Sequence, residues 1–82
     1  MKLYHFNPND YGEEAYVVAP DKAAAINVLL VSKPNLETVQ NEVDREWHIQ
    51  YHARKVAKMV TCSEGYTIDE HEPGTVIFSE VA

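Results

Sequence analysis

A chain of 82 residues is long enough for one small domain, so we expect residues 1–82 to form a single globular unit. The core of such a short chain is modest, and formation of a homodimer would add buried surface to it. Hydrophobic residues make up 45% of the chain, which excludes an intrinsically disordered protein. The formal net charge of −6 favours partners with a basic surface, so we expect no direct nucleic-acid binding and no membrane binding.

The first part of the chain predicts two strands and a helix. The segments "KLYHF" (residues 2–6) and "EEAYVVA" (residues 13–19) predict strands, and the turn formers of "NPNDYG" predict the loop between them. Residues 20–33, "PDKAAAINVLLVSK", predict a helix, because alanine favours helices and Asp21 can cap the first turn. The i, i+3, i+4 spacing assigns three residues of this helix to the core: Ile26, Leu29 and Leu30.

The next part predicts a second helix from Leu36 onward, which Asn35 can cap. At about 100° per residue, one stripe of this helix is apolar, and we expect it to face the core. The stripe consists of Leu36, Val39, Val43, Trp47 and Tyr51. Residues 55–63, "KVAKMVTCS", break the stripe and predict a strand, with a continued helix as the alternative.

The last part of the chain predicts a polar loop over residues 64–74, "EGYTIDEHEPG", and a final strand over residues 75–81, "TVIFSEV". The elements therefore follow the order β-β-α-α-β-β. We expect an α+β fold in which two helices cover one face of a four-stranded, mostly antiparallel sheet, because this arrangement buries the apolar side of each layer.

Several features predict a cytoplasmic location. Cys62 is the only cysteine, so the chain cannot form an intrachain disulfide and suits a reducing compartment. The N-terminal segment "MKLYHFNPND" turns polar too early for a signal peptide, and no apolar run approaches the roughly 20 residues that a transmembrane helix requires.

The segment "DREWHIQYHARK", residues 44–55, is the best candidate for a metal site. His48 and His52 lie four residues apart, so on a helix they could bind one metal ion together. Asp44 and His52 are about 12 Å apart along a helix, which is too far for them to share that ion. Because this row lies opposite the apolar stripe, we interpret it as a solvated face and expect no metal and no cofactor.

The same segment could bind nucleic acid if Trp47 and Tyr51 stacked on bases beside basic side chains. The apolar stripe assigns both aromatic residues to the core, so only a short basic patch is left. This alternative ligand or docking patch consists of His48, His52, Arg54 and Lys55.

No pattern typical of catalysis is present, and we predict a non-enzymatic protein without catalytic residues. Thiol catalysis would require a histidine base beside Cys62, and the sequence does not single out one of the histidines for this role. A lone cysteine is more often a small buried hydrophobic residue. The adjacent carboxylates of Glu13 and Glu14, or of Asp69 and Glu70, would diverge on a strand. The three glycines are scattered and form no phosphate-binding loop.

Acidic residues gather in two predicted loops, and loops are where small scaffolds carry recognition. Clustered carboxylates can occupy a site built for phosphates, because both groups present anionic oxygens to arginine and lysine. We therefore predict a partner-binding surface, although the simpler interpretation is that these acids only keep the protein soluble. The surface consists of Asp10, Glu13, Glu14, Glu64, Asp69, Glu70 and Glu72.

The opening "MKLYHFNPNDYGEEAYVVAPDKAAA" and the ending "GTVIFSEVA" resemble a type of short protein encoded by bacteriophages. The resemblance is confined to the two ends of the chain, and its motifs are structural. It implies a phage accessory protein, a group that includes inhibitors of host defence such as the anti-CRISPR proteins. Such inhibitors are small, acidic and non-enzymatic.

The leading hypothesis is therefore a phage inhibitor that blocks a basic, nucleic-acid-handling surface of a host defence complex in the host cytoplasm. One alternative is an oligomeric sequestrant or sensor that binds a nucleotide or a metal, and another is a structural component of an assembly. Replacing both histidines of the docking patch by alanine would abolish binding by the sequestrant and leave the inhibitor unaffected.

Overall fold

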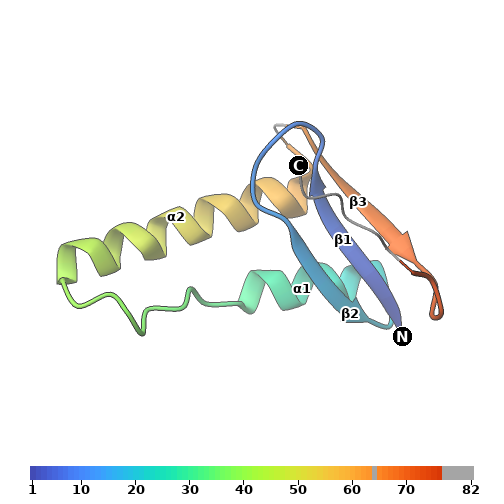
Figure 1. The fold of residues 1–82 in the computed structure, drawn as a ribbon, viewed down its shortest axis with the longest axis horizontal. Coiled ribbons are helices and arrows are strands. Elements are labelled where there is room, and N and C mark those ends of the chain that lie inside the picture. The colour runs from blue at the N-terminus through green and yellow to red at the C-terminus, as the bar shows by residue number, and fades with distance from the viewer. Residues whose placement is uncertain (64, 77–82) are drawn as a thin grey trace.

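The computed structural model describes residues 1–63 and 65–76, which form a three-stranded antiparallel sheet and two helices (Figure 1). The central strand is β1 (Lys2–Pro8). It pairs on one side with β2 (Ala15–Ala19) and on the other with β3 (Tyr66–His71). The first two strands therefore agree with the predicted hairpin.

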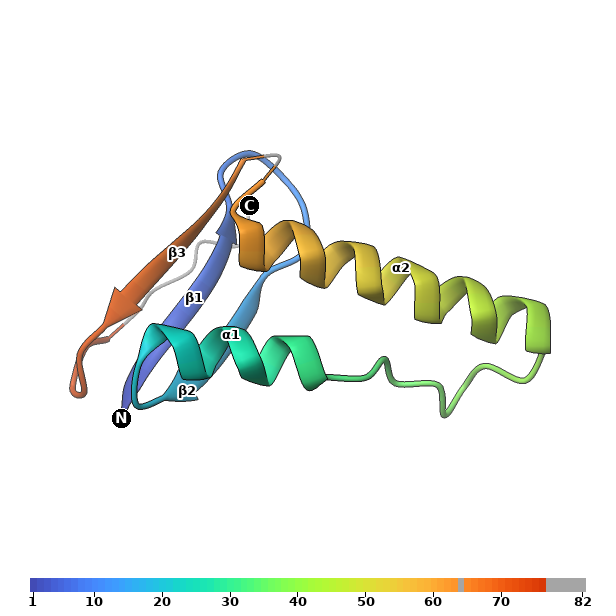
Figure 2. The same ribbon diagram turned by 180° about the vertical axis from the view of Figure 1, so that it is seen from behind.

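The helices are α1 (Lys22–Val31) and α2 (Glu42–Thr61), and they pack side by side on one face of the sheet (Figures 1 and 2). The predicted α+β class is confirmed at the level of two helices on an antiparallel sheet. Only the C-terminal part of α2 reaches the sheet, and its N-terminal part projects away from it (Figures 1 and 2). The projecting part of α2 therefore lies away from the core.

The core lies between the helices and the inner face of the sheet. Strand alternation turns Tyr4 and Phe6 of β1 inward, where they are almost completely buried. Each large side chain buried in this way stabilises the fold by about 1.5–3 kcal/mol relative to an exposed position. The buried residues of the core are Tyr4, Phe6, Val17, Ala19, Ala25, Leu29, Val56 and Met59.

Helix α1 forms as predicted, although it is shorter than residues 20–33. The Asp21 side chain accepts a hydrogen bond from the Ala24 backbone N–H at 2.8 Å and caps the first turn. Ala25 and Leu29, one turn apart, face the core. The prediction for Leu30 was wrong, because its position next to Leu29 turns its side chain about 100° away from the core, and it is 59% exposed.

Helix α2 begins later than predicted, at Glu42 instead of Leu36. The Asn35 side chain accepts a hydrogen bond from the Glu37 N–H at 3.0 Å, but this local turn does not continue as a helix. The N-cap is Asn41, whose side chain accepts from the Val43 N–H at 2.8 Å. Asparagine suits both positions, so the sequence could not choose between them.

The predicted strand over residues 55–63 was wrong, and the alternative of a continued helix is correct. Val56, Met59 and Val60 follow the i, i+3, i+4 spacing and pack against the core. The helix ends at Thr61, and Cys62 adopts the left-handed conformation, with φ of 55°, that commonly terminates helices.

This inward face also overturns the predicted stripe. Val43 is 76% exposed and Trp47 is 54% exposed, and Tyr51 is exposed as well. The rotation of α2 is fixed by Val56 and Met59, which lie on the opposite side of the helix from the predicted stripe. Leu36 and Val39 precede the helix and take no part in its face.

The polar loop predicted over residues 64–74 was wrong, because it contains β3. Tyr66 and Ile68 pack against the core, while Thr67 lies on the open face of the sheet. Polar outward residues hid the strand pattern. Residues 77–81 of the predicted final strand lie outside the described residues, so the described sheet has three strands.

Candidate functional site

The connection between β1 and β2, residues 9–14, folds over the C-terminal half of α2. Gly12 has φ of +146°, and a Cβ atom at this position would lie 3.1 Å from the Tyr66 hydroxyl and 3.3 Å from Pro8 Cβ. Glycine therefore lets the loop pass close to β1 and β3. The Tyr66 hydroxyl donates a hydrogen bond of 2.9 Å to the Glu13 carbonyl oxygen, which fixes the loop on β3.

The Glu13 side chain fixes the same loop on α2. Its carboxylate forms an ion pair with Lys55 and lies 3.5 Å from the Tyr51 hydroxyl, which donates to it. Glu13 therefore joins the sheet to α2 through its backbone and its side chain. The prediction placed Glu13 on a partner-binding surface, but most of its polar contacts are made within the chain.

A cavity of about 460 Å³ lies between this loop and α2, and we call it the loop cavity. Three cationic side chains of α2 line it: Arg54, Lys55 and Lys58. Three tyrosines also line it, one each from the loop, α2 and β3: Tyr11, Tyr51 and Tyr66. Asp10, Gly12 and Glu13 complete the lining. The cations therefore come from one short stretch of α2, whereas the three aromatic rings come from elements far apart in the sequence.

A second cavity, of about 510 Å³, adjoins the loop cavity and shares Glu13, Tyr51 and Lys55 with it. The rings of Trp47 and Tyr51 stack here, with centroids 5.1 Å apart and an angle of 7° between their planes. Aromatic pairs prefer such offset-stacked arrangements, and this pair leaves Trp47 54% exposed. The sequence prediction missed this pair because it assigned both residues to the core.

The two histidines of the predicted ligand patch are half-buried and point to different neighbours, so the predicted solvated row is wrong for them. His48 packs edge-on against Trp47, with ring centroids 5.0 Å apart. His52 Nε2 lies 3.0 Å from Ser32 Oγ, whose hydroxyl donates to the Leu29 carbonyl. Since that hydroxyl has only one proton, Nε2 of His52 is the donor to Ser32.

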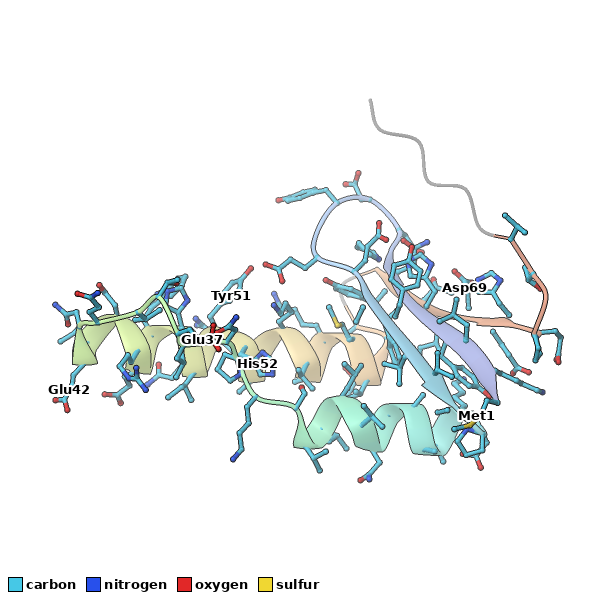
Figure 3. The ribbon with its side chains drawn as sticks, turned by 60° about the horizontal axis from the view of Figure 1, so that its bottom comes forward. Met1, Glu37, Glu42, Tyr51, His52 and Asp69 are labelled. Atoms are coloured by element: carbon cyan, nitrogen blue, oxygen red, sulfur yellow. The ribbon has the colours of Figure 1, made fainter. Side chains whose placement is uncertain are left out.

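His52 therefore ties α2 to the end of α1, and Figure 3 shows Tyr51 and His52 on different sides of the helix. No group of three or more histidine, cysteine or acidic side chains in the described part of the chain is placed to hold a metal ion. Of the predicted patch, Arg54 and Lys55 line the loop cavity, and His48, His52 and Lys55 line the second cavity.

Two predicted acidic residues meet on the open face of the sheet, on either side of His5. Glu14 Oε2 lies 3.0 Å from His5 Nε2, and Asp69 Oδ2 lies 4.0 Å from His5 Nδ1. The Tyr16 ring stacks on His5 at 4.3 Å, and its hydroxyl donates to Glu14 at 3.1 Å. Partial burial raises the pKa of the Tyr16 hydroxyl, and the hydrogen bond to Glu14 raises it further.

Two more predicted acidic residues lie at the other end of β1, beside Lys2. Lys2 Nζ lies 2.6 Å from Glu70 Oε1 and 3.3 Å from Glu72 Oε1. These carboxylates, Glu70 first, raise the pKa of Lys2 well above its ordinary value. Asp10 is exposed on the loop, and Glu64 lies outside the described residues. The predicted acidic surface is therefore divided, and much of its charge is paired with cations of the chain.

Unpaired acidic charge lies elsewhere, on the projecting part of α2. We call residues 42–50 the helical arm, and Figure 3 shows Glu42 at its far end. In residues 1–63 and 65–76, the carboxylates of Glu42, Asp44 and Glu46 form no ion pair. Exposed Val43 and Trp47 lie among them. The acidic spacing was visible in the sequence, but its exposure beside apolar side chains was not.

Neither α1 nor α2, the two helices of the described chain, is long and apolar enough to cross a membrane. Comparisons with protein-family models, with curated proteins and with solved structures find no match to this chain. The geometry of α2 and of the surfaces around it is therefore the basis for proposing a function.

Proposed function

We propose that the chain is a non-enzymatic acidic binding protein that docks on a basic surface of a partner through its helical arm. The observation that carries this proposal is the contrast between the two acidic regions. Sheet carboxylates such as Glu70 are paired with cations of the chain, whereas Glu42, Asp44 and Glu46 of the arm are exposed and form no ion pair with any described residue.

An exposed carboxylate that is not already paired gains more from a partner's arginine or lysine than one that must first give up its own lysine. Trp47 adds an apolar anchor directly after the acidic residues, and tryptophan is enriched among the residues that dominate binding energy at interfaces. The arm thus combines charge for steering with an aromatic residue for affinity.

The resemblance of the chain ends to phage accessory proteins supports a more specific version of the proposal. In this version the partner is a nucleic-acid-handling complex of host defence, and the chain inhibits it in the host cytoplasm by occupying its phosphate-binding surface. Carboxylates can replace phosphates there because both accept bidentate hydrogen bonds from arginine. Formation of a homodimer, sequestration of a ligand by an oligomer and a structural role in an assembly remain predictions.

The test compares two neutralised variants in pull-downs from bacterial lysate, followed by competition with nucleic acid for each recovered partner. The arm variant carries Glu42→Gln, Asp44→Asn and Glu46→Gln. The control carries Glu70→Gln and Glu72→Gln, which remove acids already paired with Lys2. We expect the arm variant to lose a partner that binds nucleic acid and the control to keep it.

Binding should also weaken as salt rises, because the arm is exposed and a Debye length is only about 8 Å at physiological ionic strength. A partner that is retained equally by the arm variant, or whose nucleic-acid binding is unaffected by the chain, would contradict the proposal.

A further inference from the structure

We infer that the loop cavity is a nucleotide-binding site, in which α2 cations hold the phosphates and an aromatic residue of the loop contacts the base. This inference is independent of the docking function of the helical arm. It rests on three observations: the convergence of cations, the aromatic lining and the size of the cavity.

The cations converge although the chain is acidic as a whole. Arg54, Lys55 and Lys58 lie within two turns of α2, at spacings that place all three beside the same cavity. Among the described residues Arg54 forms no ion pair, so its guanidinium is available to donate paired hydrogen bonds to a phosphate. Arginine suits this task because its planar fork matches phosphate oxygens.

The two carboxylates of the cavity offset part of this positive charge and leave Arg54 without an ion pair among the described residues. Glu13 is engaged by Lys55, and its backbone carbonyl is engaged by Tyr66. Asp10 is exposed on the loop. A ligand phosphate beside Arg54 would therefore face a cationic side chain and would not have to break the ion pair that holds the loop on α2.

The aromatic lining provides the surface for a base. Tyr51 already has Trp47 stacked at 5.1 Å and Lys55 Nζ at 5.4 Å from its ring centroid, so its ring is engaged within the chain. Tyr11 is different, because it lines the same cavity with its side chain 89% exposed. A ring left so exposed at the edge of a cationic cavity is suited to stack on a base, which typically contributes about 1–3 kcal/mol in other nucleic-acid-binding proteins.

The size and the overall charge favour a free nucleotide over a nucleic-acid strand. The volume of about 460 Å³ falls within the range of small-molecule sites, roughly 300–1,000 Å³. A strand would extend past the loop cavity toward the carboxylates of the helical arm, where its phosphates would be repelled. A mononucleotide keeps its charges within the cationic cavity.

The experiment is a titration of the full chain with ATP, followed by two-dimensional NMR of backbone amides and by calorimetry. We expect ATP to shift amide signals of residues 9–13 and of the C-terminal half of α2. Arg54→Gln should weaken ATP binding about tenfold or more, since a hydrogen bond to a charged group is lost. Lys22→Gln, which removes an equal charge on α1 outside the cavity, should leave ATP binding unchanged.

Two further variants separate this site from the histidine patch and from a simple anion site. His48→Ala with His52→Ala should keep ATP binding, because neither histidine lines the loop cavity. Tyr11→Ala should weaken ATP binding several-fold but leave the binding of inorganic phosphate unchanged, and the amide spectrum of each variant will report whether it is folded.

Four results would overturn all or part of the inference. The first is the absence of ATP-induced shifts around the cavity, and the second is an equal loss of ATP binding in the Arg54 and Lys22 variants. The third is inorganic phosphate binding as tightly as ATP, which would indicate an anion site without base recognition. A single-stranded oligonucleotide that binds more tightly than ATP would assign the cavity to a strand and would overturn the free nucleotide as the ligand.

Discussion

The hydroxyl of Tyr66 on β3 donates a hydrogen bond of 2.9 Å to the backbone carbonyl of Glu13, which lies 53 positions earlier in the chain. Through this bond the last described strand holds the loop between the first two strands over α2. Glu13 then reaches Lys55 on the helix. The geometry of the loop cavity therefore depends on a contact between the loop after β1 and the last described strand.

Removal of this hydroxyl should loosen the loop without unfolding the protein. We expect Tyr66→Phe to lower the free energy of unfolding by about 0.5–1.5 kcal/mol, which is the usual net value of one hydrogen bond. Chemical denaturation followed by circular dichroism measures the change. Tyr11→Phe is the matched control and should have no effect, because no hydrogen bond joins its hydroxyl to the described residues. Equal stability of the Tyr66 variant and the wild type would argue against the bond.

Gly12 should tolerate a side chain less well than Gly74. Both residues have positive φ, so alanine is strained at either position. At Gly12 the added Cβ would also lie 3.1 Å from the Tyr66 hydroxyl, whereas at Gly74 nothing lies within 4 Å. We expect Gly12→Ala to cost about 1–3 kcal/mol and to exceed Gly74→Ala in denaturant titrations. The reverse order would mean that the loop does not pass close to Tyr66.

The face of α2 that contacts the core can be tested by two truncations. Met59→Ala should lower the free energy of unfolding by about 2–5 kcal/mol, because it leaves a cavity in the core. Val43→Ala should change it by no more than about 0.5 kcal/mol, because Val43 is exposed. Denaturation midpoints of the two variants decide between this face and the stripe predicted from the sequence, for which Val43 would be the costly position.

The contribution of Tyr16 to stability should be lost at alkaline pH. The pKa of Tyr16 is raised above its ordinary value of 10.0 in the folded chain, so the protonated form favours folding. This contribution is complete below the unfolded pKa and is lost as pH rises through the higher folded value. Burial also raises the pKa of Tyr4, so absorbance titration of the phenols should show two late-ionising tyrosines in the wild type and one fewer in Tyr16→Phe. A Tyr16 pKa at its ordinary value of 10.0 would contradict both its partial burial and its hydrogen bond to Glu14.

Local signals in the sequence were sufficient for the first three elements. Alternation identified β1, in which Tyr4 and Phe6 are buried, and the cap at Asp21 identified the start of α1. These features depend on neighbours within a few residues. The class of two helices on an antiparallel sheet followed from them.

The rotation of α2 could not be predicted in the same way, because two stripes of this segment have helical spacing. The stripe that includes Val43 and Trp47 is as regular as the one that includes Val56 and Met59. Only the packing against the sheet decides which stripe is buried, and the sheet does not reach the N-terminal half of α2. The error at this step also hid the stacked aromatic pair.

The candidate site was predicted in part for a related reason. Arg54 and Lys55 were recognised from the basic end of the segment, and both line the loop cavity. Tyr11 and Tyr66 were not, because they come from elements far from α2 in the sequence. The strand that carries Tyr66 was itself concealed, since its outward residues are polar.

The central claim is that α2 holds Trp47 and the helical arm outside the core, and the direct test is acrylamide quenching of the fluorescence of Trp47, the only tryptophan. The measurement requires a concentration at which light scattering gives a monomer. We expect an emission maximum near that of a solvated indole and acrylamide quenching close to that of the chain unfolded in urea. Blue-shifted emission with strong protection from acrylamide would show that Trp47 is buried. That result would contradict the exposure of the helical arm and of the stacked pair of Trp47 and Tyr51.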